Sequence, residues 1–137
     1  MLPELSLAAT GLSDENLANF PKLAALSRLV LDDNPIRGQA IRQLHDQPAL
    51  IDLSLNCSTI TDLCAPNLAE LKRLKRLSLV GAGLTDAGIR HLEGLTNLES
   101  LDLRKTKATK EGIERLQHAL PTGGIVWEAG VVEPGKK

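Results

Sequence analysis

The sequence has few aromatic residues, few cysteines and almost no net charge. Phe20 and Trp127 are the only aromatic residues among 137, and there is no tyrosine. Two cysteines are too few for a disulfide scaffold. A net charge of −1 argues against a general binder of nucleic acid or of anionic membranes. No apolar run approaches the roughly 18 residues of a membrane span.

No basic and apolar leader opens the chain. We therefore expect a cytoplasmic location if the chain is complete, although the sequence itself names no compartment. The same composition predicts neither a membrane span nor a nucleic-acid partner.

Leucine is abundant instead, and it recurs at a fixed period. The chain contains 27 leucines, and Leu-x-Leu pairs begin every 24 residues, at Leu5, Leu29, Leu53, Leu77 and Leu101. One further step reaches the apolar segment 125–127. Such a period indicates a repeat architecture in which stacked units share one core. We expect a repeat domain over residues 1–127, closed by a short strand at 125–127, and a partly disordered tail over 128–137.

Each unit changes its apolar period from two to three or four. Leu-x-Leu is the alternation of a strand, whereas the later apolar columns, such as those of Ile41 and Leu44, follow a helical stripe. Ser13, Thr61, Thr85 and Thr109 occupy one repeat position and are typical helix N-caps, and an acidic residue follows the first three of them. Each unit is thus predicted to be a strand, a turn, a helix and a return.

These motifs resemble the leucine-rich repeats. The pattern L-x-x-L-x-L-x-x-[T/N/S]-x-[L/I] is present at residues 26–36, 50–60 and 74–84, with Ala82 departing in the last. The segment 84–89, LTDAGI, is similar to bacterial, planctomycete-like and ribonuclease-inhibitor-like repeats. The resemblance covers about residues 2–127. It implies an α/β fold, a right-handed solenoid with a parallel sheet on the concave face and helices on the convex face. Members of the family generally bind proteins through the concave sheet, which is an analogy of class.

Three units depart from the pattern. Repeat two has Pro35-Ile36-Arg37-Gly38 in place of the cap, which predicts an irregular turn. Repeat three has Cys64 where later units have glycine, and its Pro66 predicts a helix that begins late. Ala82 lacks the polar side chain of its column, so we expect a water or a shifted loop there.

Residues between the inward leucines should face the concave surface. The column before each pair is Glu4, Arg28, Asp52, Arg76 and Ser100, whose alternating signs fit either a charged binding strip or mutual neutralisation. The face is poor in the aromatic anchors that usually supply binding energy. The residues that we predict to contact a protein partner there are Arg28, Asp32, Asp33, Asn56, Arg76, Arg104 and Lys105.

Catalytic and metal-binding chemistry has little support. Nucleophilic catalysis needs a base beside the nucleophile, but all three histidines fall on the helical side of their repeats and none can serve Cys57. Two thiols seven residues apart without nearby ligands do not make a zinc site. We expect no catalytic residue, no metal and no cofactor, with Cys64 a buried structural residue and Cys57 an exposed thiol.

The predicted function is a non-enzymatic protein-interaction module. The alternative is a structural or sensor segment of a larger protein, or a self-associating assembly. The basic run 71–77 keeps the leucines of the repeat, so its cations fill solvent positions. The first strand has no capping element before it, and an uncapped repeat exposes an apolar face and a free strand edge. This end is the predicted site of self-association.

Overall fold

The strands stack in chain order into one sheet. The computed structural model describes residues 4–38, 41–56, 59–127 and 130–132. Six parallel strands are followed by one antiparallel strand. Their bounds are β1 Glu4–Ser6, β2 Arg28–Val30, β3 Asp52–Ser54, β4 Arg76–Ser78, β5 Ser100–Asp102, β6 Gly124–Trp127 and β7 Gly130–Val132.

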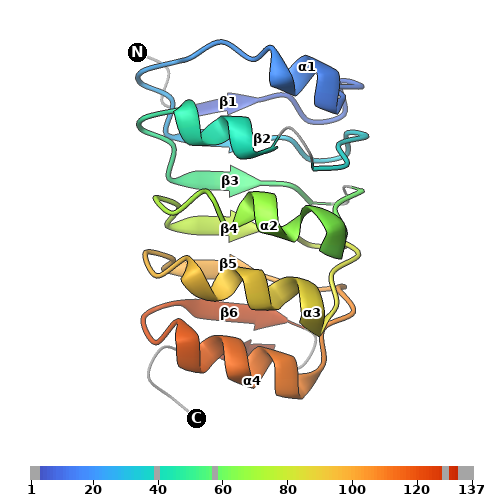
Figure 1. Ribbon diagram of the computed structural model, residues 1–137, viewed down its shortest axis with the longest axis vertical. Coiled ribbons are helices and arrows are strands. Elements are labelled where there is room, and N and C mark those ends of the chain that lie inside the picture. Colours follow the sequence, from blue (N-terminus) through green and yellow to red (C-terminus); the bar gives the residue numbers. More distant parts are fainter. Residues whose placement is uncertain (1–3, 39–40, 57–58, 128–129, 133–137) are drawn as a thin grey trace.

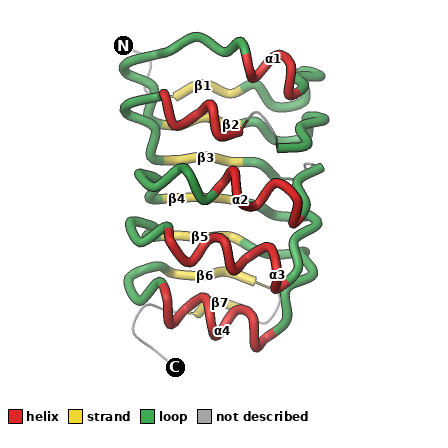
Figure 2. The backbone as a smooth tube through the Cα atoms, in the orientation of Figure 1, coloured by secondary structure: helices red, strands yellow, loops and turns green. Residues whose placement is uncertain are grey.

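Helices cover one face of this sheet, and the chain ends lie at opposite ends of the stack (Figure 1). We call the covered side the helix face, and the opposite side, the predicted concave surface, the sheet face. The elements of the helix face are α1 Asp14–Ala18, the 3-10 helices η1 Ile41–Asp46 and η2 Asp62–Cys64, α2 Ala65–Leu68, α3 Asp86–Ile89, the 3-10 helix η3 Arg90–Gly94, and α4 Lys110–Ala119. Figure 2 shows the alternation of strand, loop and helix along the coil, which is right-handed as parallel crossovers are.

The register of the sheet equals the sequence period. Leu29 pairs with Leu53, Leu53 with Leu77, and Leu77 with Leu101, so that each step is one repeat. The ladder continues from Leu101 to Ile125 in β6. Each strand from β2 to β6 thus lies one repeat period after the strand before it.

The core consists of stacked layers of these repeated side chains. In repeats two to five both leucines of each strand pair are buried, with exposures of 0–2%. The helical positions behind them, such as Ile41 and Ile89, are buried to the same extent. Repeat one differs, because Leu5, Leu7, Leu12, Phe20 and Leu23 are only partly buried. Among the described residues, the first layer has a neighbouring layer on one side only.

The predicted N-caps are present. The side chains of Ser13, Thr61, Thr85 and Thr109 each accept a hydrogen bond from a backbone N–H of the first turn. Repeat two lacks such a residue, and its helical element is the 3-10 helix η1, which begins at Ile41. In repeat three, α2 begins at Ala65 with Pro66 in its first turn, but η2 precedes it from Asp62, so the helical segment does not begin late as predicted.

The acidic residue after the cap has a second role that joins neighbouring repeats. Thr85 is the N-cap of the next helix, and Asp62 accepts hydrogen bonds from its N–H and its hydroxyl, at 2.8 and 2.5 Å. Asp86 binds both groups of Thr109 in the same way. Asp14 accepts from the backbone N–H groups of Arg37 and Gly38. Each carboxylate thus fixes the start of the following helical segment.

Glycine at the third helical position makes room for this carboxylate. A Cβ atom on Gly88 would lie 2.0 Å from Asp62 Oδ1, and one on Gly112 would lie 2.1 Å from Asp86 Oδ1. Cys64 takes this position in repeat three and occupies the space next to Gly38, where a Cβ would lie 2.0 Å from the Cys64 Cβ. The T-D-x-G motif is therefore a packing unit between repeats.

Asn34 and Ala82 occupy the same repeat position on the turns but make different contacts. Asn34 is 3% exposed, and its amide donates to the Leu7 and Leu31 carbonyls while its oxygen accepts from the N–H of Leu12. The Ala82 side chain makes no such bonds, while the N–H of the next residue, Gly83, donates to the Ile60 carbonyl at 2.7 Å, as the N–H of Lys107 does to the Leu84 carbonyl one repeat later. The water or shifted loop expected at Ala82 stays a prediction.

The two ends of the stack differ. At the C-terminal end β7 pairs with the outer edge of β6, and Trp127 packs against the core. Residues 128–129 and 133–137 lie outside the described residues, so the partial disorder of the tail stays a prediction. At the N-terminal end β1 has one strand neighbour among the described residues, which is β2.

The Asp86–Gly112 contact predicts a non-additive pair of substitutions. Gly112→Ala should lower the free energy of unfolding by about 1–3 kcal/mol, because the new methyl group overlaps the Asp86 carboxylate. In an Asp86→Ala background the same change should be neutral or stabilising by up to about 1 kcal/mol, since alanine favours helix over glycine. Urea unfolding of the four proteins measures the coupling. Gly94→Ala is the control, because a Cβ there meets nothing within 4 Å; equal costs in both backgrounds would contradict the packing role.

Candidate protein-binding faces

The first column of the sheet face is a continuous ladder of ion pairs. Arg28 lies 3.2 Å from Glu4 and 3.6 Å from Asp52, and Arg76 lies 3.0 Å from Asp52. Both arginine side chains are about half exposed. Alternating charges on adjacent strands therefore pair with each other, and each exposed pair contributes roughly 0–1 kcal/mol. Of the two interpretations of this column, the geometry favours mutual neutralisation.

The next column is a ladder of hydrogen bonds that runs along the sheet. Asp32 accepts from the Ser54 hydroxyl at 2.6 Å and from the Asn56 N–H at 2.8 Å. Asn56 repeats the arrangement one strand later, where its side-chain oxygen accepts from the Ser78 hydroxyl and from the Val80 N–H. Both predicted contact residues therefore hold strand ends in place with the same atoms that a partner would use.

The remaining predicted contact residues lie where the strands end. Asp33 and Lys105 are exposed and have left-handed backbones, with φ of 59° and 60°. Ala9 and Gly81 share this conformation at the same repeat position. The turn thus presents Asp33 and Lys105 at the rim of the sheet face in repeats two and five. Arg104 is exposed too, and its guanidinium binds Asp102 at 2.7 Å.

The residues considered for catalysis do not come together. His45, His91 and His118 are exposed on η1, η3 and α4, as predicted. Cys64 is buried; burial raises the pKa of its thiol, which donates to the Thr61 carbonyl. A protonated and buried thiol is a poor nucleophile. Cys57 lies outside the described residues.

The described part of the chain has neither a metal-binding cluster nor a membrane-spanning helix. It contains no group of three or more His, Cys, Asp or Glu side chains placed to hold a metal ion. None of its helices has the length and apolar character needed to cross a bilayer.

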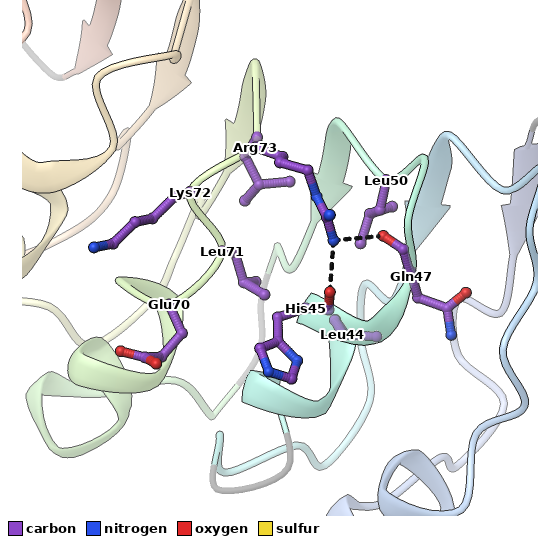
Figure 3. A pocket seen from close by; sticks show the side chains of 9 residues that line it. Leu44, His45, Gln47, Leu50, Glu70, Leu71, Lys72 and Arg73 are labelled. Atoms are coloured by element: carbon purple, nitrogen blue, oxygen red, sulfur yellow. Dashed lines mark hydrogen bonds between the residues drawn. The ribbon is translucent and has the colours of Figure 1, made fainter.

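A pocket opens on the helix face between repeats two and three (Figure 3). Its volume is about 250 Å³, and a second hollow of about 210 Å³ shares His45 and Glu70 with it. Arg73 closes one side, where its guanidinium donates to the carbonyls of His45 and Gln47 at 2.5 and 3.1 Å. The pocket is lined by Leu44, His45, Gln47, Leu50, Glu70, Leu71, Lys72, Arg73 and Leu74.

Gln47 explains why a space exists at this point. Its repeat position carries leucine in repeats one, three and four, at Leu23, Leu71 and Leu95. Gln47 instead turns toward repeat one, where its amide oxygen accepts from the Leu23 N–H and its nitrogen donates to the Pro21 carbonyl. Figure 3 shows this side chain directed away from Leu71. The packing that a leucine would supply on the other side is therefore missing.

Comparison with solved structures identifies the fold. A leucine-rich repeat protein of Leptospira interrogans superposes on 75% of this chain with a TM-score of 0.60 and 28% sequence identity. Internalin C2 of Listeria monocytogenes superposes on 90% of the chain and 70% of its own length, with a TM-score of 0.52 and 22% identity. The chain therefore has the leucine-rich repeat fold. No family model matches its sequence, and no curated protein matches it at a significant level.

The size of the match differs between the two structures. The chain covers 26% of the length of the Leptospira protein. The resemblance to leucine-rich repeats inferred from the sequence is confirmed in fold, and the solved neighbours support the relation. The predicted contact residues are not tested by either comparison.

The pocket was not predicted from the sequence. Its leucines belong to the repeat template, and its cations, Lys72 and Arg73, were assigned to solvent positions. The one signal is the polar residue at position 47 in a column of leucines, which is visible only once the repeat columns are aligned. Which way that amide turns is not encoded in the period.

The hydrogen-bond ladder of the sheet face gives a stability prediction. Asp32→Ala should lower the free energy of unfolding by about 1–3 kcal/mol, since the Ser54 hydroxyl and the Asn56 N–H lose their acceptor. Asp33→Asn is the matched control, because asparagine also tolerates the left-handed backbone, and it should change stability by less than about 0.5 kcal/mol. Denaturant titrations of both variants check this. Equal costs at the two positions would show that the ladder does not support the strands.

Proposed function

We propose that this protein is a non-enzymatic protein-binding module and that a partner lies across its sheet face. The observation that carries the proposal is the ordered row of side chains on that face. Neighbouring parallel strands lie about 4.8 Å apart, so Arg28, Asp32, Asn56, Arg76 and Arg104 form one polar strip. A strip with both signs suits an extended polar partner surface.

The chemistry of the strip limits the affinity of this contact. Its arginines are already paired with carboxylates, as in Arg28–Asp52 and Arg104–Asp102. A partner must exchange these pairs for its own, so little net energy is gained per charge. The contact should therefore be polar and shape-driven, and ionic strength should alter its association rate more than its dissociation rate.

Charge reversal at the C-terminal end of the strip tests the proposal. Once a partner has been captured, the double variant Arg104→Glu/Lys105→Glu should weaken binding about tenfold, mainly through the association rate, because two cations of the strip become anions. The control Arg90→Glu/Glu93→Lys carries reversals on the helix face and should bind like the unmodified protein. Surface plasmon resonance at two salt concentrations measures both rates. Loss of binding in the control alone would move the contact to the helices.

A second candidate function is self-association through β1. The C-terminal edge of the sheet is covered by β7, whereas the first layer leaves Leu5, Leu7, Leu12, Phe20 and Leu23 partly exposed. Two-fold pairing of β1 with its copy would cover both edges at once. Antiparallel pairing centred on Leu5 sets Glu4 opposite Ser6 of the copy, so no like charges face each other in the pairing.

A proline at Ser6 separates an edge contact from other modes of association. The Leu7 N–H donates to the Val30 carbonyl of β2, so alternation along the strand turns the Ser6 N–H to the open edge. Ser6→Pro removes that donor and should shift a dimer to monomer, while Ser6→Ala keeps the donor and should leave the dimer intact. Sedimentation equilibrium over a concentration series measures this. A monomer at the highest concentration in the unmodified protein would contradict self-association.

A further inference from the structure

The pocket between repeats two and three combines an apolar floor with a cationic rim. Its floor consists of Leu44, Leu50, Leu71 and Leu74, which are at most 4% exposed. We propose that it binds a protein segment in which one large apolar side chain is flanked by carboxylates. This is a binding site on the helix face, separate from the polar strip of the sheet face.

The volume of the pocket favours a single side chain over a small-molecule ligand. Sites for drug-sized ligands and cofactors measure about 300–1,000 Å³, whereas this pocket measures about 250 Å³. That space is of the order of one leucine or phenylalanine side chain. Anchors of this kind, inserted in a desolvated pocket, dominate the energy of many protein interfaces. The adjoining hollow extends the surface on one side, where the flanking residues of a bound segment would lie.

The charges at the rim specify the flanking residues. Arg42, Lys72 and Arg73 line the two hollows, against one carboxylate, Glu70. None of these three cations forms an ion pair with a carboxylate of the described residues, in contrast to Arg28 and Arg76 on the sheet face. An arriving carboxylate therefore gains a new ion pair here without breaking an existing one.

The walls of the pocket are held in position before any ligand arrives. Arg73 donates two hydrogen bonds to carbonyl groups of repeat two, and Gln47 is fixed by its contacts with repeat one. A preformed site avoids much of the entropy cost of ordering side chains on binding. Lys72 is exposed beside this framework, and its charge can be changed without touching those hydrogen bonds.

A peptide titration tests the site directly. The probe is the acetylated and amidated pentapeptide Asp-Glu-Phe-Asp-Glu, added to the full chain labelled with nitrogen-15. Amide shifts should concentrate in residues 42–50 and 69–74, with dissociation constants in the millimolar range expected of a single anchor. Lys72→Glu should weaken binding about threefold to tenfold. Lys75→Glu, an equivalent reversal at an exposed residue outside the lining, should leave the affinity unchanged.

Further arms of the titration decide between occupants. A peptide with alanine in place of phenylalanine, or with asparagine and glutamine in place of the acids, should bind more weakly than the probe. The proposal would be overturned if these peptides bound as tightly as the probe, or if Lys75→Glu weakened binding as much as Lys72→Glu. It would also be overturned if the shifts were confined to the strands, or if a millimolar excess of probe caused none. A stronger response to octanoate than to the peptide would also overturn it, in favour of a small carboxylate.

Peptide binding in the pocket does not depend on the proposed function of the sheet face. Arg104→Glu/Lys105→Glu should leave the peptide titration unchanged, whatever its effect on a captured partner. Failure of the polar strip and failure of the pocket are therefore distinguishable in the same set of proteins.

Discussion

Neighbouring parallel strands all pair at one fixed offset, the repeat period, and the stacking of the repeats depends on it. The strand leucines pair with residues one repeat period away, as in Leu53 and Leu77. The carboxylate of Asp62 reaches the cap residue of the next helix, Thr85, over nearly the same distance in sequence. One residue inserted within a strand would turn the residues after it to the opposite face and displace these contacts together, because the side chains of a strand alternate between its two faces. The strict period is thus a physical requirement of the core.

The repeat period predicted those features that depend on one unit alone. Strand positions, buried columns and the caps at Ser13, Thr61, Thr85 and Thr109 follow from alternation and from local hydrogen bonding, so they are visible in the sequence. In repeat three, Pro66 stands in the first turn of α2, where its missing N–H costs nothing, but the helical segment already begins at Asp62 in η2 and so does not start late. Contacts between units are different. That Asp86 binds Thr109, and that Gly112 makes room for it, becomes evident only when the neighbouring coil is in place.

The two faces of the molecule differ in what they leave available. On the sheet face, Arg28, Asp32 and Arg76 already satisfy one another or the strand ends. Their types and columns were predictable, but their engagement follows from side-chain directions that the period does not encode. On the helix face, the amide of Gln47 turns to repeat one and leaves a space beside Leu71. Gln47, a single polar residue in a column of leucines, is thus associated with a pocket that combines an apolar floor with cations that form no ion pair among the described residues.

Solution NMR can detect the fixed offset of one repeat between paired strand residues. Residues that pair in the sheet should give nuclear Overhauser effects between their backbone protons, along Arg28, Asp52 and Arg76 and along Leu53, Leu77 and Leu101. Cross-strand effects are expected at this single register from β1 to β6. Effects at a register slipped by one residue in either direction, or their absence between two neighbouring strands, would contradict the fixed offset.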